Sequence, residues 1–160
     1  MLNLYLKTIF ALQYYIKIMI LMNNSKQTTN QNNCIIFGNS DIGNFIIESL
    51  LNSNINYNIT FLTEEQINTK FNNDINILFG NIYDPKILKN LDFSNTKLSI
   101  CCSENTNLNI LTASYMKSLK AENIFCCSYD TQYNNLLNSK NIITFNPWNI
   151  PNKLNSLWRT

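Results

Sequence analysis

The residues whose types and spacing most clearly indicate a binding site form a glycine turn that directly follows a short apolar segment. They are Gly38, Asn39, Ser40, Asp41, Ile42 and Gly43. In such a turn the first glycine allows a tight bend, the middle position lets the backbone approach a pyrophosphate, and the last glycine lets a helix pack closely on a sheet. The spacing predicts that a helix N-terminus binds the phosphate groups of a nucleotide here.

Two residues of this turn depart from the ideal pattern. Ser40 occupies the position of the middle glycine, where its side chain narrows the approach of a phosphate without forbidding it. Asp41 places a carboxylate in the first helical turn, where it favours the helix dipole but repels a phosphate. An alternative interpretation is that Ser40 and Asp41 only cap a helix in a scaffold that has lost its ligand.

A second candidate position follows the next apolar segment, residues 58 to 62. Thr63 and Glu64 stand where a carboxylate usually accepts hydrogen bonds from ribose hydroxyls. The same acidic residue can also open the next helix and favour its dipole, and the two interpretations are compatible.

The composition excludes several classes of function. The chain has no histidine, which excludes Ser-His-Asp and Cys-His nucleophiles and histidine-ligated zinc. The net charge of +2 is spread without a basic cluster, so we expect no nucleic-acid partner. The five cysteines are an odd number without a clear secretory signal, which favours a reducing compartment over a disulfide framework.

Two cysteine pairs, Cys101-Cys102 and Cys126-Cys127, end two strands that we expect to be neighbours. Such pairs are typical of a thiolate metal site or a redox switch. Because successive strand residues point to opposite faces, at most one sulfur of each pair can converge. We therefore predict no metal site and interpret the thiols as small buried hydrophobic groups.

Short apolar segments alternate with stretches of helical periodicity along most of the chain. We expect helices at residues 41 to 52, near Glu64, from Asp84-Pro85, at 104 to 119 and at 130 to 138, with Ser103 and Asp130 as further caps. This alternation predicts an α/β fold, a Rossmann-like doubly wound and mostly parallel sheet of about six strands with helices on both faces. The expected strands are residues 34–38, 58–62, 75–80, 97–102, 123–128 and 142–145.

Three parts are expected along the chain: an apolar segment at residues 1–22, a polar linker at 23–32 and a Rossmann-type domain at 33–160. Lys7 and Lys17 interrupt the apolar segment, so it is not a clean membrane span. It is either a membrane-surface helix, the end of a missing membrane domain, or translated upstream sequence without a role.

Four motifs in order resemble one family, the TrkA N-terminal domain, also called the regulator-of-potassium-conductance (RCK) nucleotide-binding domain. The motifs are IIFGNSDIG at the first turn, LTEE after the second strand, FGNIYDPKILKNLDF after the third and SENTNLN after the fourth. The late segment NIITFNPWNIPNKL is also similar to that family. The resemblance covers about residues 33 to 154.

The resemblance implies a regulatory domain without catalytic activity that binds NAD(H) or an adenine nucleotide, ATP or ADP. It implies a homodimer or higher oligomer that contacts the membrane subunit of a potassium channel or transporter, in the cytoplasm and at or tethered to the membrane. Residues 38 to 43 would contact the phosphates, Thr63 or Glu64 the ribose, Asn81 and Ile82 the adenine side, and Ser103 the mouth of the fourth strand. Ser40, Asp41 and Asn81, which replaces the usual aspartate, depart from the family pattern.

Two other functions compete with this one. A small NAD-dependent oxidoreductase needs a positioned proton donor, but the chain has neither histidine nor a recognisable Tyr-x-x-x-Lys pair. A degenerate RCK assembly module that no longer binds ligand is the other alternative, and Ser40 and Asp41 support it.

Overall fold

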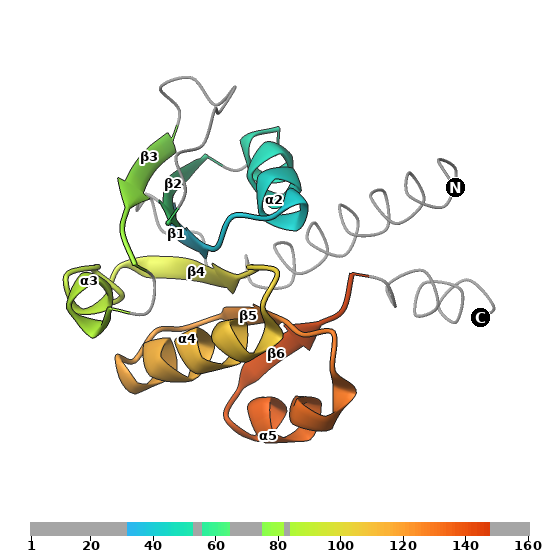
Figure 1. The fold of residues 1–160 in the computed structure, drawn as a ribbon. Helices are drawn as coiled ribbons and strands as arrows, with labels where there is room; N and C mark the ends of the chain where they lie inside the picture. The colour runs from blue at the N-terminus through green and yellow to red at the C-terminus, as the bar shows by residue number, and fades with distance from the viewer. Residues whose placement is uncertain (1–31, 53–55, 65–74, 82–83, 148–160) are drawn as a thin grey trace, which may run out of the picture.

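The computed structural model describes residues 32–52, 56–64, 75–81 and 84–147. These residues form a six-stranded parallel sheet in the order β3-β2-β1-β4-β5-β6 (Figure 1). The strands are β1 (Asn32–Phe37), β2 (Tyr57–Thr63), β3 (Ile75–Phe79), β4 (Thr96–Cys101), β5 (Ile124–Cys127) and β6 (Ile142–Phe145). All six predicted strands are confirmed, with ends that shift by one or two residues.

The direction in which successive strands are added to the sheet reverses between β1 and β4. The chain moves outward from β1 to β2 and β3, returns to the other edge of β1 with β4, and then continues to β5 and β6. In open parallel sheets of this order a crevice forms outside the carboxyl ends of the strands at the switch point. The glycine turn follows β1 and therefore lies at that point.

The two faces of the sheet bury separate apolar clusters because neighbouring strand residues point in opposite directions. In β1, Cys34 and Ile36 belong to the first cluster, whereas Ile35 and Phe37 belong to the second. Apolar side chains on both faces explain why β1 reads as a continuous hydrophobic run rather than an alternating one.

Helices cover both faces, as the sequence predicts (Figure 1). Helix α2 (Asp41–Leu51) packs on the first cluster through Ile46, Ile47 and Leu50. The second cluster receives α3 (Pro85–Lys89), α4 (Thr106–Ser118) and α5 (Asn134–Ser139), with the short 3-10 helix η1 (Thr131–Tyr133) before α5. The predicted helix at residues 130 to 138 is thus divided in two.

The helix starts show one correction. Asp84 caps α3 and Asp130 caps η1, as predicted. Ser103 does not cap α4, because the helix begins at Thr106 and the side chain of Asn105 accepts a hydrogen bond from Leu108 N at 3.2 Å. Ser103 is instead part of the loop between β4 and α4.

Several expectations fall outside the described residues. They are the segment at 1–22, nearly all of the linker at 23–32, the helix expected near Glu64, and Ile82. In the described part of the chain, no helix is long and apolar enough to cross a membrane.

Candidate functional site

The glycine turn is closed against the end of β4. Gly38 adopts a φ of 96°, and a Cβ atom built there would lie 2.5 Å from the backbone nitrogen of Ser103. Both the left-handed backbone and the close approach require glycine. Gly38 N also donates to Leu62 O at 3.1 Å, so the turn is attached to β2 on one side and abuts Ser103 on the other.

Gly43 allows α2 to approach the sheet closely. A Cβ atom at Gly43 would lie 2.9 Å from Gly38 O and 3.1 Å from the Sγ atom of Cys102. Cys102 is bonded to the same turn, since its backbone nitrogen donates to Phe37 O at 2.9 Å. The first turn of α2 therefore lies directly on the junction between β1 and β4.

Ser40, at the middle position of the motif, has its side chain turned into the protein. Its Oγ accepts a hydrogen bond from Gly43 N at 3.0 Å and donates one to Cys102 O. The residue is 7% exposed. Ser40 is thus the N-cap of α2 and also joins the turn to β4, and its hydroxyl is occupied within the protein.

The start of α2 offers backbone donors beside a carboxylate. The first amides of any helix, here those of Asp41 and Ile42, have no partner within the helix and can bind an anion. The side chain of Asp41 is exposed in this same turn. The site can therefore hold a phosphate through backbone hydrogen bonds, but the carboxylate of Asp41 opposes the charge of that phosphate.

A buried amide side chain holds the loop after β4. Asn109, in α4, is 2% exposed and bonds to Ser103 and to Cys127 O, at the end of β5. Asn109 was not predicted as a site residue, because asparagine is abundant throughout this chain and one amide does not stand out. No local signal distinguishes it, because its partners Ser103 and Cys127 become neighbours only in the folded sheet.

The other residues predicted to contact a nucleotide lie at the carboxyl ends of the next two strands, β2 and β3. Thr63 is fully buried, and Thr63 O accepts a hydrogen bond from Gly80 N at 3.0 Å. Glu64 is exposed at the end of β2, and Asn81 is exposed after β3. The sheet brings residues 38 to 43 together with Ser103. Glu64 and Asn81 lie at the same carboxyl-terminal end of the sheet, after β2 and β3.

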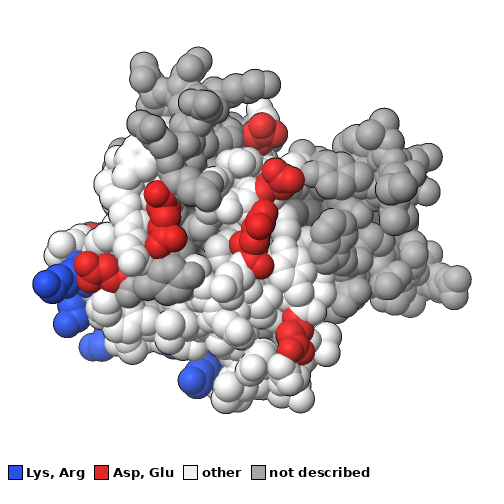
Figure 2. All heavy atoms as spheres, in the orientation of Figure 1, with Lys and Arg blue, Asp and Glu red and all other residues white. Residues whose placement is uncertain are grey.

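Acidic side chains are frequent at the carboxyl-terminal end of the sheet. Within the described residues, a carboxylate follows each of the first five strands: Asp41, Glu64, Asp84, Glu104 and Asp130. Figure 2 shows acidic side chains spread across one face, with lysines near the α3 and α4 margin. The negative charges gathered here disfavour a highly charged anion at the helix N-terminus.

The cysteine pairs divide between the two faces of the sheet. Cys101 and Cys126 are register partners and lie in the second apolar cluster, whereas Cys102 and Cys127 lie in the first. All five cysteines are free and buried, and burial raises the pKa of the Cys126 and Cys127 thiols to about 12. Among the described residues no group of three or more metal-binding side chains comes together.

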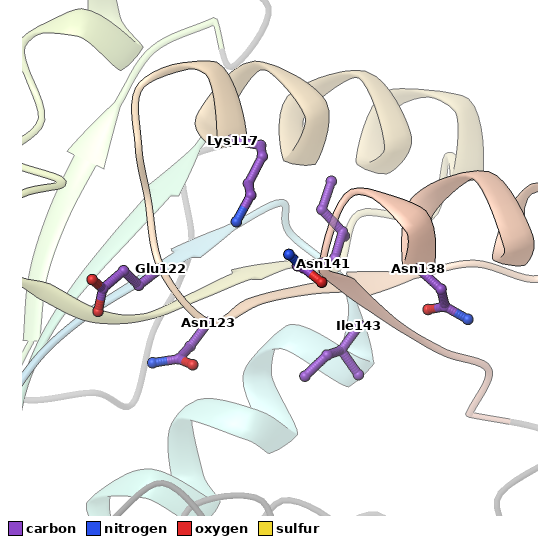
Figure 3. Close-up of a pocket in the computed structure, with 7 residues that line it drawn as sticks. Lys117, Glu122, Asn123, Asn138, Asn141 and Ile143 are labelled. Atoms are coloured by element: carbon purple, nitrogen blue, oxygen red, sulfur yellow. The ribbon is translucent and has the colours of Figure 1, made fainter. Parts of the chain in front are cut away.

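A separate hollow of about 470 Å³ lies at the opposite end of the sheet, beside the starts of β5 and β6 (Figure 3). Its lining includes Lys117, Glu122, three asparagines and the β6 residues Ile142 and Ile143. None of the predicted site residues lines it, so the hollow is separate from the glycine turn.

The strand order and the glycine turn at its switch point define a Rossmann-type α/β domain. A family model described as the TrkA-N domain matches residues 34–144. The chain therefore belongs to the TrkA-N domain family, which confirms the family that its motifs resemble.

A solved structure shows the same fold. The structure titled "Crystal Structure of the GsuK RCK domain" is similar with a TM-score of 0.57 and 14% sequence identity. The likeness covers 74% of this chain and 26% of that one, so the chain spans about a quarter of the length of this neighbour. A search of curated proteins finds no match.

Proposed function

We propose that this chain is a regulatory, non-catalytic domain of a potassium-transport system that binds a nucleotide at the switch point between β1 and β4. The glycine turn carries this proposal, because Gly38 is closed against Ser103 and α2 starts directly above the β1–β4 junction. Membership of the TrkA-N family and the fold shared with an RCK domain support the link to potassium transport.

The ligand proposed is NAD(H) or an adenine nucleotide, ATP or ADP. Its phosphates would lie at residues 38 to 43, and Glu64, exposed at the end of β2, would accept hydrogen bonds from a ribose. Asn81 is exposed after β3 on the adenine side, where Ile82 would also contribute. The acidic edge of the sheet favours the least charged of these nucleotides.

The regulation proposed is a shift between two arrangements of the domain. A ligand changes such an equilibrium only when its affinity differs between the two states. A membrane subunit of a potassium channel or transporter would respond to that shift, with the domain in the cytoplasm, peripheral to or tethered at the membrane. Such assemblies require a dimer or a higher oligomer of this chain, which light scattering of the purified protein measures directly.

Equilibrium binding of NADH, ATP and ADP to the purified chain tests the ligand. We expect saturable binding of at least one of them, with amide chemical-shift changes concentrated at residues 38 to 43 and at Ser103. The variant Glu122→Gln, at the opposite end of the sheet, is the matched control and should bind equally well. Absence of binding at millimolar nucleotide would contradict the proposal.

A ligand-free assembly module is the second candidate, and two observations favour it. The hydroxyl of Ser40 is occupied by Gly43 N and Cys102 O, and carboxylates line the crevice edge. This function predicts an oligomer whose stability does not change with any nucleotide, because a ligand stabilises only when it binds the folded state.

A further inference from the structure

The amide of Asn109 uses its full hydrogen-bonding capacity inside the protein. Its Oδ1 accepts from Ser103 N at 2.8 Å and from Ser103 Oγ at 2.7 Å. Its Nδ2 donates to Ser103 O at 2.8 Å and to Cys127 O at 3.0 Å. An amide side chain offers two donors and one oxygen with two lone pairs, so no capacity remains for a ligand.

These four bonds fix the Ser103 backbone, against which the glycine turn closes. A Cβ atom at Gly38 would lie within 2.6 Å of both the nitrogen and the Cα of Ser103. A small displacement of Ser103 therefore changes the contact with Gly38. Because Asn109 also bonds to Cys127 O, the same side chain fixes the end of β5 relative to that of β4.

Few other side chains can replace Asn109 in this arrangement. Aspartate has the same shape but lacks both donors, and it would place a second oxygen against the carbonyls of Ser103 and Cys127. Alanine would remove the Asn109 partners of the buried N–H and C=O groups of Ser103, at the cost of their desolvation. The requirement is for an amide of this length rather than for a polar residue in general.

We propose that Asn109 is the positioning residue of the crevice, which acts through Ser103 to set the separation between the Gly38 turn and the end of β4. This inference rests on the proposed function, since the geometry it fixes is that of the nucleotide site. Asn109 does not contact the ligand. Its role is to hold β4 and β5 in the arrangement that leaves the start of α2 open to a phosphate.

The test compares Asn109→Asp and Asn109→Ala with two control variants in the full chain. Leu137→Ala removes a fully buried side chain of α5, and Asn107→Ala removes an exposed amide of α4. At a temperature where all variants are folded, we expect both Asn109 variants to lose about 10-fold in affinity for NADH or ATP. Both controls should stay within about 2-fold of the unaltered chain.

Hydrogen exchange supplies a readout that needs no ligand. The amides of residues 38 to 43 and of Ser103 should exchange faster in the Asn109 variants, while Leu137→Ala raises exchange according to its loss of global stability. Equal exchange patterns in the Asn109 and Leu137 variants would overturn the inference. If the unaltered chain binds no nucleotide, the proposed function fails, and exchange still decides the role of Asn109.

A milder variant covers the case in which both Asn109 variants fail to fold. Ser103→Ala removes only the bond from Ser103 Oγ to Asn109 and the weaker one to Asn105 O. We expect a smaller change in the same direction, with faster exchange at residues 38 to 43. Unchanged exchange at that turn would contradict the inference.

Discussion

The carboxyl and amino ends of the strands differ in the residues that surround them. At the carboxyl ends of the strands lie most of the buried polar side chains: Ser40, Thr63, Ser103, Asn109 and Ser128. Ser40 and Asn109 link different elements through hydrogen bonds to Cys102 O and Cys127 O. At the amino ends, Lys120 and Asn141 follow α4 and α5 with positive φ, and Asn123 has a positive φ just before β5.

The difference shows which end of the sheet needs a defined geometry. A buried hydroxyl or amide is stable only when its partners are in place, so the carboxyl end has few alternative arrangements. Positive φ values at non-glycine residues cost free energy that glycine would not lose at the same positions. We therefore expect substitutions at the carboxyl end to be damaging, whereas several at the amino end should be harmless or beneficial.

Alkaline pH should have the largest effect, because four of the five thiols lie at the carboxyl ends of β4 and β5. Burial raises the pKa of Cys126 and Cys127 to about 12 and that of Cys101 and Cys102 well above the ordinary range. The folded state therefore retains these protons more tightly than the unfolded state does. Stability from this source is complete below pH of about 8.5 and falls above it by about 1.4 kcal/mol per pH unit for each thiol.

Urea unfolding between pH 7 and 10 measures this dependence. The variant Cys126→Ala should reduce the slope above pH of about 8.5 by the contribution of one thiol. A free energy of unfolding that is constant up to pH 10 would show that the thiols reach water in the folded state.

Gly38→Ala should give the largest effect of a single substitution. The new Cβ atom would lie 2.5 Å from Ser103 N at a φ of 96°, and we expect a loss of about 3 to 5 kcal/mol in the free energy of unfolding. Gly80→Ala is the control, because its Cβ atom meets only the end of the Ile87 side chain, at 2.5 Å, and that side chain can move. We expect about 1 kcal/mol there. Equal losses in urea unfolding would mean that the Gly38 turn is not specially constrained.

Asp41→Asn should raise nucleotide affinity, an effect smaller in free energy than that of Gly38→Ala on unfolding. Removing the carboxylate from the first turn of α2 relieves its repulsion of a phosphate, and we expect ATP to bind about 2- to 5-fold more tightly. The gain should be smaller for NADH, which carries less charge, and absent for Glu122→Gln at the other end of the sheet. An unchanged ATP affinity in calorimetric titration would place the phosphates away from α2.

Lys120→Gly should stabilise the domain slightly. Lys120 follows α4 with a φ of 64°, a conformation that glycine adopts without strain, and we expect a gain of about 1 kcal/mol. Lys140→Gly is the matched control, since Lys140 has a φ of −93° and glycine there only adds freedom to the unfolded chain. A thermal melt of both variants distinguishes them by the sign of the change. A lower melting temperature for Lys120→Gly would show that its side chain has a stabilising contact.

The fold was predictable because each strand is a continuous apolar run between helical stretches. That pattern locates β1 to β6 within one or two residues and places helices on both faces. The start of α4 was predicted less well, since Ser103, Glu104 and Asn105 can all begin a helix, and only tertiary contacts decide between them.

The candidate site was less predictable than the fold. The position of the Gly38 turn follows from its spacing, but the inward rotation of Ser40 depends on Cys102 O, which lies far away in the sequence. Asn109 was missed for a related reason. Its partners, Ser103 and Cys127, become neighbours only when β4 and β5 are paired, and no local pattern separates it from the many exposed asparagines.

The position of β1 between β2 and β4 also has a consequence for synthesis on the ribosome. Residues 38 to 43 emerge early and can form the internal bond between Ser40 Oγ and Gly43 N as soon as α2 forms. The floor of the turn, from Cys102 to Ser103, is translated about sixty residues later, so one edge of β1 stays unpaired during that interval. Under the proposed function, a ribosome stalled before Ser103 should therefore hold a chain that does not bind a nucleotide.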